Sequence, residues 1–398
     1  MVIDFLSKAI RRDPFPQYDR IRSSSPVLYD PRAKTWMVFD FDSVKRVLSD
    51  HETFSSSMFT AKQRNPPWFI FFDPPRHTKL RALVMRAFTP RVVANMEPRI
   101  RELSRTLLDR TIDRGEMDVV SDFATPLPMM VVGDVLGLPE ADLPRFTHWS
   151  EVIVKLSYSI SDGEEADQAA MDFLMATVEM QDYLSELMAE RRAAPKDDLL
   201  TKLVEAEVEG EGLTEEEILG FFQLLLVGGT ETTTNMISNA VLCLAENPSQ
   251  RALLEARRDL LPSAIEEVVR YRSSIQWEYR ATKRDVKLRG QLIPAEQLVL
   301  AMIGSANRDP QQFHDPDRFD ITRNPNPHIA FGFGIHFCLG AALSRMEGRI
   351  ALTDFLDRMK NFELASNQPW EPRKALHVHG PASLPVRFES GRRIGVSA

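Results

Sequence analysis

Cys338 is the residue whose surroundings most clearly suggest chemistry. It lies in the segment FGFGIHFCLG, residues 331–340, and helix-forming residues follow from Ala341. Gly332 and Gly334 permit a tight backbone path. The expected helix places the thiol beside unsatisfied N–H groups, which lower the pKa of a thiol. A thiolate held in this way is suited to bind iron. The alternative is a buried structural thiol, the usual fate of a cysteine outside a disulfide.

The segment 213–247 predicts a long helix with a weak centre. Its apolar residues recur at spacings of three and four. Thr214 and Glu217 form a capping-box pattern at its start, and Pro248 ends it. The central residues 228–234, GGTETTT, are poor helix formers that each cost roughly 0.3 to 1 kcal/mol relative to alanine. This composition indicates either a helix opened for function or a close crossing of two helices.

Two pairs of side chains share a helix face. Glu267 and Arg270 are three residues apart, and His77 and Arg81 are four residues apart. A surface ion pair contributes only about 0.3 to 0.5 kcal/mol. Two cationic side chains on one face can form charge-assisted hydrogen bonds with carboxylates. Ordinary surface charge is the alternative for each of these residues.

Together these motifs resemble those of the cytochrome P-450 family in its soluble bacterial form. The segment 331–340 matches the family's haem-binding loop, FGxGxHxCxG, and the resemblance runs from Trp36 to Phe388. It implies a mainly α fold with a small β region. In this fold, a helix-rich prism, haem lies between the long central helix and the helix that follows the cysteine loop. We expect a single domain, 1–398, with the β-containing region at roughly 1–60 and 280–300.

The resemblance also assigns roles to residues. The cofactor would be haem b with the Cys338 thiolate as axial ligand. The cofactor-binding residues would be His77, Arg81, Arg280, Phe331, Gly332, His336 and Gly340. Thr232 would hydrogen-bond dioxygen at the iron, and Glu231 would help to deliver protons. Thr230 stands where many relatives carry His, Asn or Arg, which could alter the proton path. The pair Glu267 and Arg270 would lock the irregular chain ahead of the ligand, a structural role.

The implied activity is a haem-thiolate monooxygenase that inserts one oxygen atom from dioxygen into a hydrophobic small molecule, by hydroxylation or epoxidation. Electrons would come from an external ferredoxin and its reductase, because the sequence shows no flavin-binding or iron–sulfur segment. Residues 71–114 contain ten Lys or Arg and five Asp or Glu. We expect an acidic ferredoxin to dock on a basic face near Lys79, Arg81, Arg345 and Arg349.

The substrate pocket can be predicted only by resemblance. The candidate contacts are Leu224, Val227, Gly228, Ile275 and Trp277, with residues 68–72 on a nearby loop. Their apolar character suggests a terpenoid, steroid, fatty acid or macrolide. Packing in the protein core is the alternative for each of them. Glu278 would meet a cationic or hydroxylated group of the substrate, or pair with a neighbour.

Two other functions compete with this one. The first is a thiolate-haem protein for peroxide-driven oxidation, isomerisation or gas sensing. The pair Glu231 and Thr232 argues against it, because peroxide-using relatives typically lack this acid–alcohol pair. The second is a helical protein without haem that binds zinc through Cys338, His336 and His377. The lack of a CxxC pair argues against a zinc site.

The wider sequence indicates which elements position these residues. The expected elements are a strand at 36–40 followed by a helix through Val44 and Leu48, helices at 97–114 and 171–192, a hairpin within 284–300 that turns at Arg289-Gly290, and an irregular connection at 304–330. The chain is therefore mostly helical with a minor sheet.

Composition narrows the class of protein further. The 398 residues carry a net charge of −8, which argues against a nucleic-acid partner. Two cysteines are too few for a secreted disulfide scaffold. The most apolar stretch, 221–229, is far shorter than the roughly 20 residues that span a bilayer, and residues 1–12 show no signal-peptide core. We expect a cytoplasmic monomer with no membrane partner.

Overall fold

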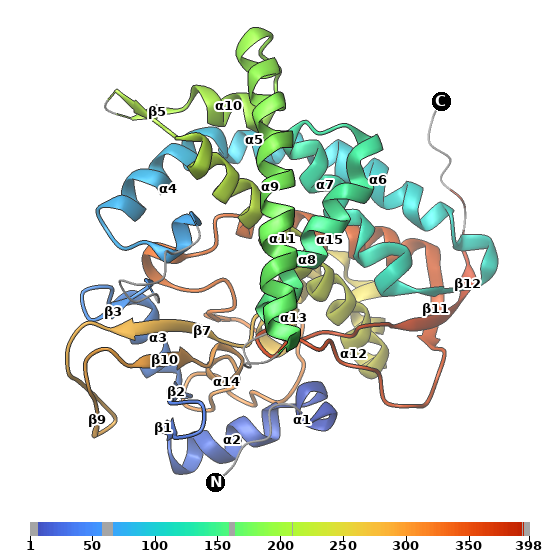
Figure 1. Cartoon of the computed structure of the whole chain (residues 1–398). Helices are drawn as coiled ribbons and strands as arrows, with labels where there is room; N and C mark the ends of the chain where they lie inside the picture. Colours follow the sequence, from blue (N-terminus) through green and yellow to red (C-terminus); the bar gives the residue numbers. More distant parts are fainter. Residues whose placement is uncertain (1–6, 58–66, 159–163, 209, 392, 394–398) are drawn as a thin grey trace. The chain divides into compact units, whose positions relative to one another are not determined.

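The computed structural model describes residues 7–57, 67–158, 164–208, 210–391 and 393. The chain forms two compact units, each built from separate stretches of sequence (Figure 1). Unit 1 contains residues 1–58, 101–126 and 232–398, and unit 2 contains residues 59–100 and 127–231. The expectation of a single domain over 1–398 stays a prediction.

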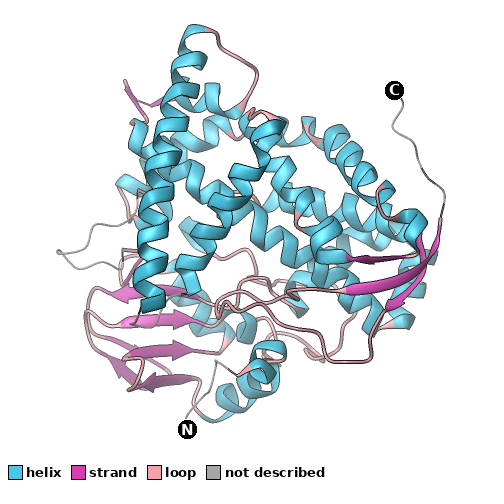
Figure 2. Ribbon diagram, turned by 45° about the vertical axis from the view of Figure 1, so that its right-hand side comes forward, coloured by secondary structure: helices cyan, strands magenta, loops and turns pink. Residues whose placement is uncertain are grey.

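Helices dominate the described chain (Figure 2). They are α1 (Lys8–Arg12), α2 (Phe15–Ser24), α3 (Phe41–Ser49), α4 (Arg76–Ala87), α5 (Pro90–Asn95), α6 (Glu97–Asp109), α7 (Pro126–Leu136), α8 (Leu143–Tyr158), α9 (Glu164–Ala193), α10 (Leu199–Glu205), α11 (Glu215–Glu246), α12 (Pro248–Ala256), α13 (Leu261–Tyr271), α14 (Ile303–Ala306) and α15 (Ala341–Arg358). The long predicted helices correspond to α6, α9 and α11.

The strands are short. They are β1 (Val27–Asp30), β2 (Thr35–Val38), β3 (Phe54–Ser55), β4 (Glu116–Asp118), β5 (Glu207–Val208), β6 (Glu211–Gly212), β7 (Glu278–Thr282), β8 (Val286–Leu288), β9 (Gln291–Ile293), β10 (Leu298–Ala301), β11 (Met359–Leu364) and β12 (Pro385–Ser390). The largest sheet has the order β1-β2-β10-β7-β3, in which β2 and β10 are parallel and the other pairs antiparallel. It lies in unit 1, within the predicted β region, whereas β4, β11 and β12 form a second sheet outside that region.

The large sheet is buried on both faces, because successive side chains of a strand point to opposite sides. Val299 and Ala301 of β10 pack with apolar residues of α3 and α14. Met37 of β2 packs on the other side, with Phe15 and Tyr18 of α2. The sheet is thereby fixed between helices, and with it β7, which carries Arg280.

Local chemistry explains where the main elements start and turn. The capping box predicted for α11 is present: the Glu217 N–H donates to Thr214 Oγ1 at 3.2 Å, and the Thr214 N–H donates to Glu217 Oε2 at 3.0 Å. The predicted hairpin is β8–β9, turning at Arg289 (φ 45°) and Gly290 (φ 82°). Positive φ at both turn residues suits a two-residue hairpin. Strand β10 follows this hairpin in the chain and pairs with β2 and β7 in the large sheet.

Some boundaries differ from the expectation. The strand expected at 36–40 ends at Val38, because the Asp40 carboxylate caps α3 by accepting from the Ser43 N–H at 3.1 Å. The helix expected at 97–114 ends at Asp109 and gives way to a short 3₁₀ turn. The connection at 304–330 is irregular after the short helix α14, as predicted.

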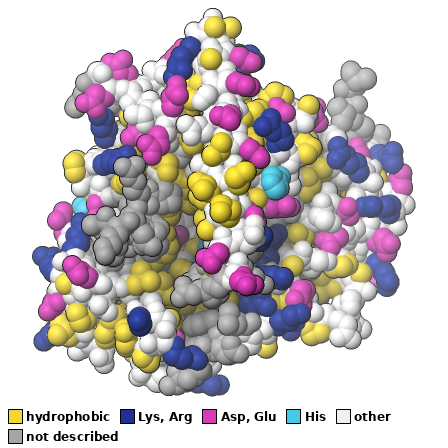
Figure 3. Space-filling model, viewed as in Figure 1, with side chains coloured by type: hydrophobic (Ala, Val, Ile, Leu, Met, Phe, Trp, Pro, Cys, Tyr) yellow, Lys and Arg dark blue, Asp and Glu magenta, His cyan; other side chains and the backbone are white. Residues whose placement is uncertain are grey.

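One face of α9 is apolar and exposed. Four large apolar side chains of this face are more than half exposed. They are Met171 (57%), Leu174 (57%), Met175 (61%) and Val178 (52%). Figure 3 shows hydrophobic side chains gathered over this helix. Among the described residues, no helix is both long enough and apolar enough to cross a membrane.

Candidate active site

The cysteine loop holds Cys338 by its backbone. The Cys338 N–H donates to the Phe331 carbonyl at 2.8 Å, and the side chain is exposed. Helix α15 begins three residues later, at Ala341, with Gly340 as its N-cap. A Cβ on Gly340 would lie 4.0 Å from the Cys338 sulfur, in contact with it. The thiol is therefore presented at a helix N-terminus, and the alternative of a buried structural thiol is wrong.

Two glycines give the loop its shape. Gly332 and Gly334 have φ values of +74° and +78°, a conformation that other residues rarely adopt. At Gly334 a Cβ would also lie 3.0 Å from the Ser49 Cα and 3.2 Å from the Leu48 carbonyl oxygen. A side chain at position 334 would push the loop away from the end of α3. The predicted need for a tight backbone path is confirmed.

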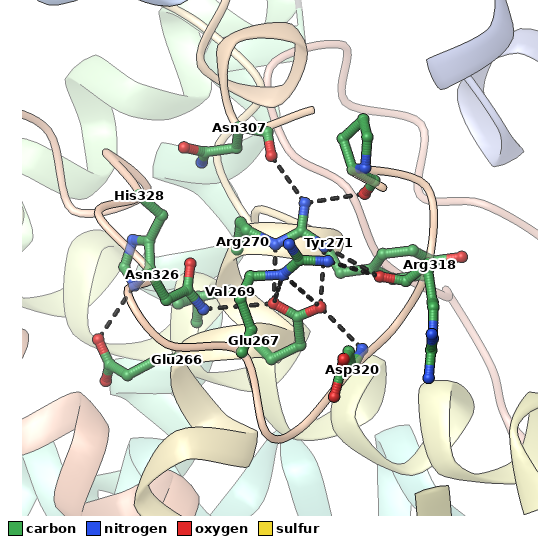
Figure 4. A network of polar contacts seen from close by, with 12 residues as sticks. Glu266, Glu267, Val269, Arg270, Tyr271, Asn307, Arg318, Asp320, Asn326 and His328 are labelled. Carbon is green, nitrogen blue, oxygen red and sulfur yellow. Dashed lines mark hydrogen bonds and ion pairs between the residues drawn. The ribbon is translucent and has the colours of Figure 1, made fainter. Parts of the chain in front are cut away.

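Behind the loop, Glu267 and Arg270 form a fully buried ion pair. Their side chains are 0% exposed, and the Arg270 Nε donates to Glu267 Oε2 at 2.7 Å. Figure 4 shows the pair facing into the connection between α14 and the cysteine loop. Arg270 donates to the carbonyls of Asn307 and Pro316, both at 2.9 Å. The Asp320 N–H donates to Glu267 at 2.9 Å. The pair holds an irregular segment that has no secondary structure of its own.

Thr232 lies where α11 meets the chain that follows α13. The Ser274 hydroxyl donates to the Thr232 carbonyl at 2.9 Å. Ile275 and Trp277, two predicted substrate contacts, follow directly, and both are half-buried. Ile275 forms an isolated bridge with Val378. In unit 1, Thr232 is thus hydrogen-bonded to the segment that carries Ile275 and Trp277.

The other predicted pocket residues lie in unit 2. Leu224 and Val227 are half-buried, and Gly228 is exposed, on one face of α11 whose other faces are largely buried. A Cβ added at Gly228 would meet no atom within 4 Å, whereas one at Gly229 would lie 2.8 Å from Val132 of α7. The helix-crossing interpretation is confirmed at Gly229, whereas Gly228 borders open space and the opening of the helix for function stays a prediction.

Thr230 is held by its neighbours. Its hydroxyl bonds to the Leu226 carbonyl one turn earlier, and Ser150 Oγ of α8 lies 3.1 Å from Thr230 Oγ1. Both Thr230 and the adjacent Glu231 are buried. The Thr230 hydroxyl therefore bonds to the helix and to α8.

The four predicted anion-binding side chains divide between the units. In unit 1, Arg280 is buried on β7, and His336 Nε2 lies 2.8 Å from Ser56 Oγ. In unit 2, His77 is buried and Arg81 half-buried, one turn apart on α4 as predicted.

Comparison with known proteins identifies the family. The family model "Cytochrome P-450" matches residues 163–384. The putative cytochrome P-450 YjiB of Bacillus subtilis is 43% identical over 359 residues, covering 90% of each chain. The chain belongs to the cytochrome P-450 family.

Solved structures agree with this assignment. CYP109E1 from Bacillus megaterium, in complex with testosterone, is 39% identical with a TM-score of 0.87, covering 94% of this chain and 99% of that one. CYP109Q5 from Chondromyces apiculatus is 36% identical with a TM-score of 0.90, covering 98% of each chain. The predicted cytochrome P-450 fold is confirmed, and the chain is a monooxygenase of a family that takes electrons from external redox partners.

The residues of the cysteine loop fit the family's haem. The family carries haem with a thiolate ligand, and the loop offers an exposed thiol beside Gly340, where a Cβ would contact the sulfur at 4.0 Å. Unit 1 also supplies Arg280 and His336, hydrogen-bond donors of the kind that porphyrin carboxylates accept from. Among the described residues, no three His, Cys, Asp or Glu side chains cluster as metal ligands. The zinc alternative through Cys338, His336 and His377 therefore has no support.

Sequence reasoning missed several partners of these residues. Ser274 holds Thr232, and Arg323 Nε donates to Glu267 Oε2 at 3.2 Å. Glu266 and Arg345 form an ion pair beside the cysteine loop. The only sequence signal for the last pair is the position of Glu266 directly before Glu267.

Proposed function

We propose that Cys338 is the axial thiolate ligand of haem b in this monooxygenase. The observation that carries this proposal is the exposed thiol of Cys338, three residues before α15, on a backbone whose N–H donates to the Phe331 carbonyl. We assign Arg280, His336, His77 and Arg81 to the two carboxylates of the porphyrin. When bound, the haem supplies the activation of dioxygen, and the protein supplies position, polarity and protons.

We assign proton delivery to Thr232 and Glu231. Glu231 and Thr232 are consecutive on α11, and the Ser274 hydroxyl donates to the backbone carbonyl of Thr232 at 2.9 Å, which fixes this turn of the helix against the chain after α13. An acid and an alcohol on one ordered turn are suited to deliver protons to dioxygen, a contribution typical of positioned acids. We assign Thr230 no step in this relay, since its hydroxyl bonds to the Leu226 carbonyl and lies 3.1 Å from Ser150 Oγ.

The Thr232→Ala variant tests this assignment. We expect the product formed per electron consumed to fall by about tenfold or more, with peroxide released instead. Thr234→Ala is the matched control, a buried threonine two residues along the same helix. Equal coupling in the two variants would contradict the role of Thr232. Wild-type turnover driven as well by added peroxide as by dioxygen and reductase would favour the peroxide-using alternative.

We propose a hydrophobic substrate of steroid size. The half-buried apolar residues Ile275, Trp277, Leu224 and Val227 support an apolar guest, and the similar CYP109E1 was crystallised with testosterone. Burial raises the pKa of Glu278, while Arg280 beside it acts in the opposite direction. We assign this carboxyl to a cationic or hydroxylated group of the substrate. A substrate-induced shift of the Soret band with testosterone tests the proposal, with a fatty acid as the comparison.

We propose a ferredoxin as the electron donor. Arg345 and Arg349 are one turn apart on α15, the helix that follows the cysteine loop. Lys79 of the predicted face is ion-paired with Glu211, and Arg345 is ion-paired with Glu266. We choose Arg349, half-buried on α15, as the residue that tests this face. We expect Arg349→Glu to slow reduction by a ferredoxin while reduction by dithionite stays unchanged. An unchanged ferredoxin rate would contradict docking on this helix.

A further inference from the structure

Glu266 and Arg345 form a clamp beside the cysteine loop. The Arg345 Nε donates to Glu266 Oε1 at 2.7 Å, and its Nη2 donates to Glu266 Oε2 at 2.8 Å. This two-bond geometry fixes the guanidinium in one plane. The clamp links α13 to α15, and its side chains are partly exposed, 29% for Glu266 and 37% for Arg345.

The clamp lies against Phe331, the residue that binds the Cys338 backbone. The Arg345 guanidinium lies 4.4 Å from the centre of the Phe331 ring, within the range of a cation–π contact. The carbonyl of Phe331 accepts the N–H of Cys338 at 2.8 Å. The Arg345 guanidinium on α15 therefore contacts the same residue, Phe331, whose carbonyl accepts the backbone N–H of Cys338.

His328 completes the clamp. Its Nε2 lies 3.0 Å from Glu266 Oε2, as the dashed line in Figure 4 marks. Its Nδ1 accepts the Ala330 N–H at 3.3 Å, which leaves Nε2 to donate to the Glu266 carboxylate. The two ions of the clamp, Glu266 and Arg345, contribute one negative and one positive charge and balance each other.

We propose that this balanced clamp sets the reduction potential of the haem iron. The inference rests on the proposed ligation of haem by Cys338. Charges and hydrogen bonds around a metal ligand tune its potential. An uncompensated positive charge beside the thiolate favours the reduced iron, and an uncompensated negative charge favours the oxidised iron. Glu266 and Arg345 are thus positioning residues that act through Phe331 and the loop.

The test is a spectroelectrochemical titration of the substrate-free holoenzyme with chemical mediators, in which no protein donor has to dock. Glu266→Gln leaves Arg345 uncompensated, so the potential should rise. Arg345→Gln leaves Glu266 uncompensated, so the potential should fall. The double variant restores the balance and should return towards the wild-type value. Arg345→Lys keeps the charge and should shift the potential less than Arg345→Gln.

The ion pair of Arg258 with Asp357 provides a matched control. It also involves α15, at 2.9 Å, but lies near the far end of that helix from Cys338. Arg258→Gln and Asp357→Asn should leave the potential unchanged. High salt should reduce the shifts of the clamp variants, because the clamp is partly exposed.

Shifts of the same sign in Glu266→Gln and Arg345→Gln would overturn the proposal, because mere loosening of the loop would move both alike. Unshifted potentials in variants that keep a thiolate-type carbon monoxide spectrum would also overturn it, and would leave the ligation by Cys338 intact. A wild-type protein without that spectrum would contradict the ligation itself.

Discussion

Glu266 and Glu267 are adjacent on α13, yet they belong to two different kinds of network. Glu267 pairs with Arg270 inside the protein, where both side chains are 0% exposed. Glu266 pairs with Arg345 at the surface, where both are partly exposed. The buried pair holds backbone groups of the connection at 307–320, whereas the surface pair lies against the ring of Phe331.

The difference shows what burial does to an ion pair. A buried charge that loses its partner is left unpaired in a poorly polarisable medium, at a large cost in stability. A partly exposed charge that loses its partner is solvated instead, at a small cost. The inner pair is therefore suited to hold the fold, and the outer pair can change the electrostatics of the loop without unfolding it.

The largest effect is expected from the buried pair. Glu267→Gln or Arg270→Lys should lower the free energy of unfolding by about 3 to 5 kcal/mol, because each leaves a buried charge without its full set of partners. Urea denaturation of the holoenzyme measures this loss. A loss below about 1 kcal/mol would place this pair in the same class as the surface pair.

An effect of opposite sign is expected at Glu347 of α15. Its burial raises the pKa well above the usual value, and among the described residues its Oε2 has no hydrogen-bond partner. Burial therefore disfavours the charged form of this carboxyl in the fold, whereas the unfolded chain carries it charged at pH 7, and the difference costs stability. Glu347→Gln should raise the free energy of unfolding by about 1 kcal/mol at pH 7. The gain should shrink as the pH falls from 7 towards about 4.3, where the unfolded carboxyl also becomes protonated, and should be absent below that pH. Destabilisation at pH 7 would show that Glu347 has a partner that glutamine cannot replace.

A smaller loss is expected from the clamp. Arg345→Gln should lower the free energy of unfolding by less than about 1 kcal/mol, because the pair is partly exposed. Urea denaturation of Arg345→Gln and Arg270→Lys in the same series compares the losses in the free energy of unfolding for the two networks directly. A loss as large as that of the buried pair would remove the distinction on which the potential-setting role depends.

The smallest effect is the pH dependence of the clamp. Burial acts to raise the pKa of Glu266, but hydrogen bonds from His328 and Arg345 outweigh it and lower the pKa to about 2. A lowered carboxyl pKa adds stability above the unfolded value, and this stability is lost as the pH falls through the folded value. The stability difference between wild type and Arg345→Gln should therefore shrink between about pH 4.5 and 2. A difference that stays constant over this range would contradict the ion pair.

The site was predictable from the sequence where a local pattern encodes it. Three motifs each span ten residues or fewer. They are the glycines and cysteine of the loop, the capping box of α11 and the pair Glu267–Arg270. The clamp joins Glu266 to Arg345, which are 79 residues apart. The chain between them is largely irregular, and no periodicity reports which of its side chains meet. The different environments of Gly228 and Gly229 also depend on where α7 packs, a tertiary fact.

The fold divides in the same way. Long periodic helices and the hairpin at 286–293 follow from spacing and turn chemistry. The parallel pairing of β2 with β10 joins residues more than 250 positions apart, and no pattern in the sequence predicted it. The strands β4, β11 and β12 carried no pattern that we interpreted as a sheet.

The central claim is that Cys338 binds the haem iron as a thiolate. The most direct test is the absorption spectrum of the reduced protein with carbon monoxide, minus that of the reduced protein alone. We predict a strongly red-shifted Soret band, and its loss in Cys338→His. A wild-type band at the position of histidine-ligated haem, or no Soret band at all, would contradict the claim.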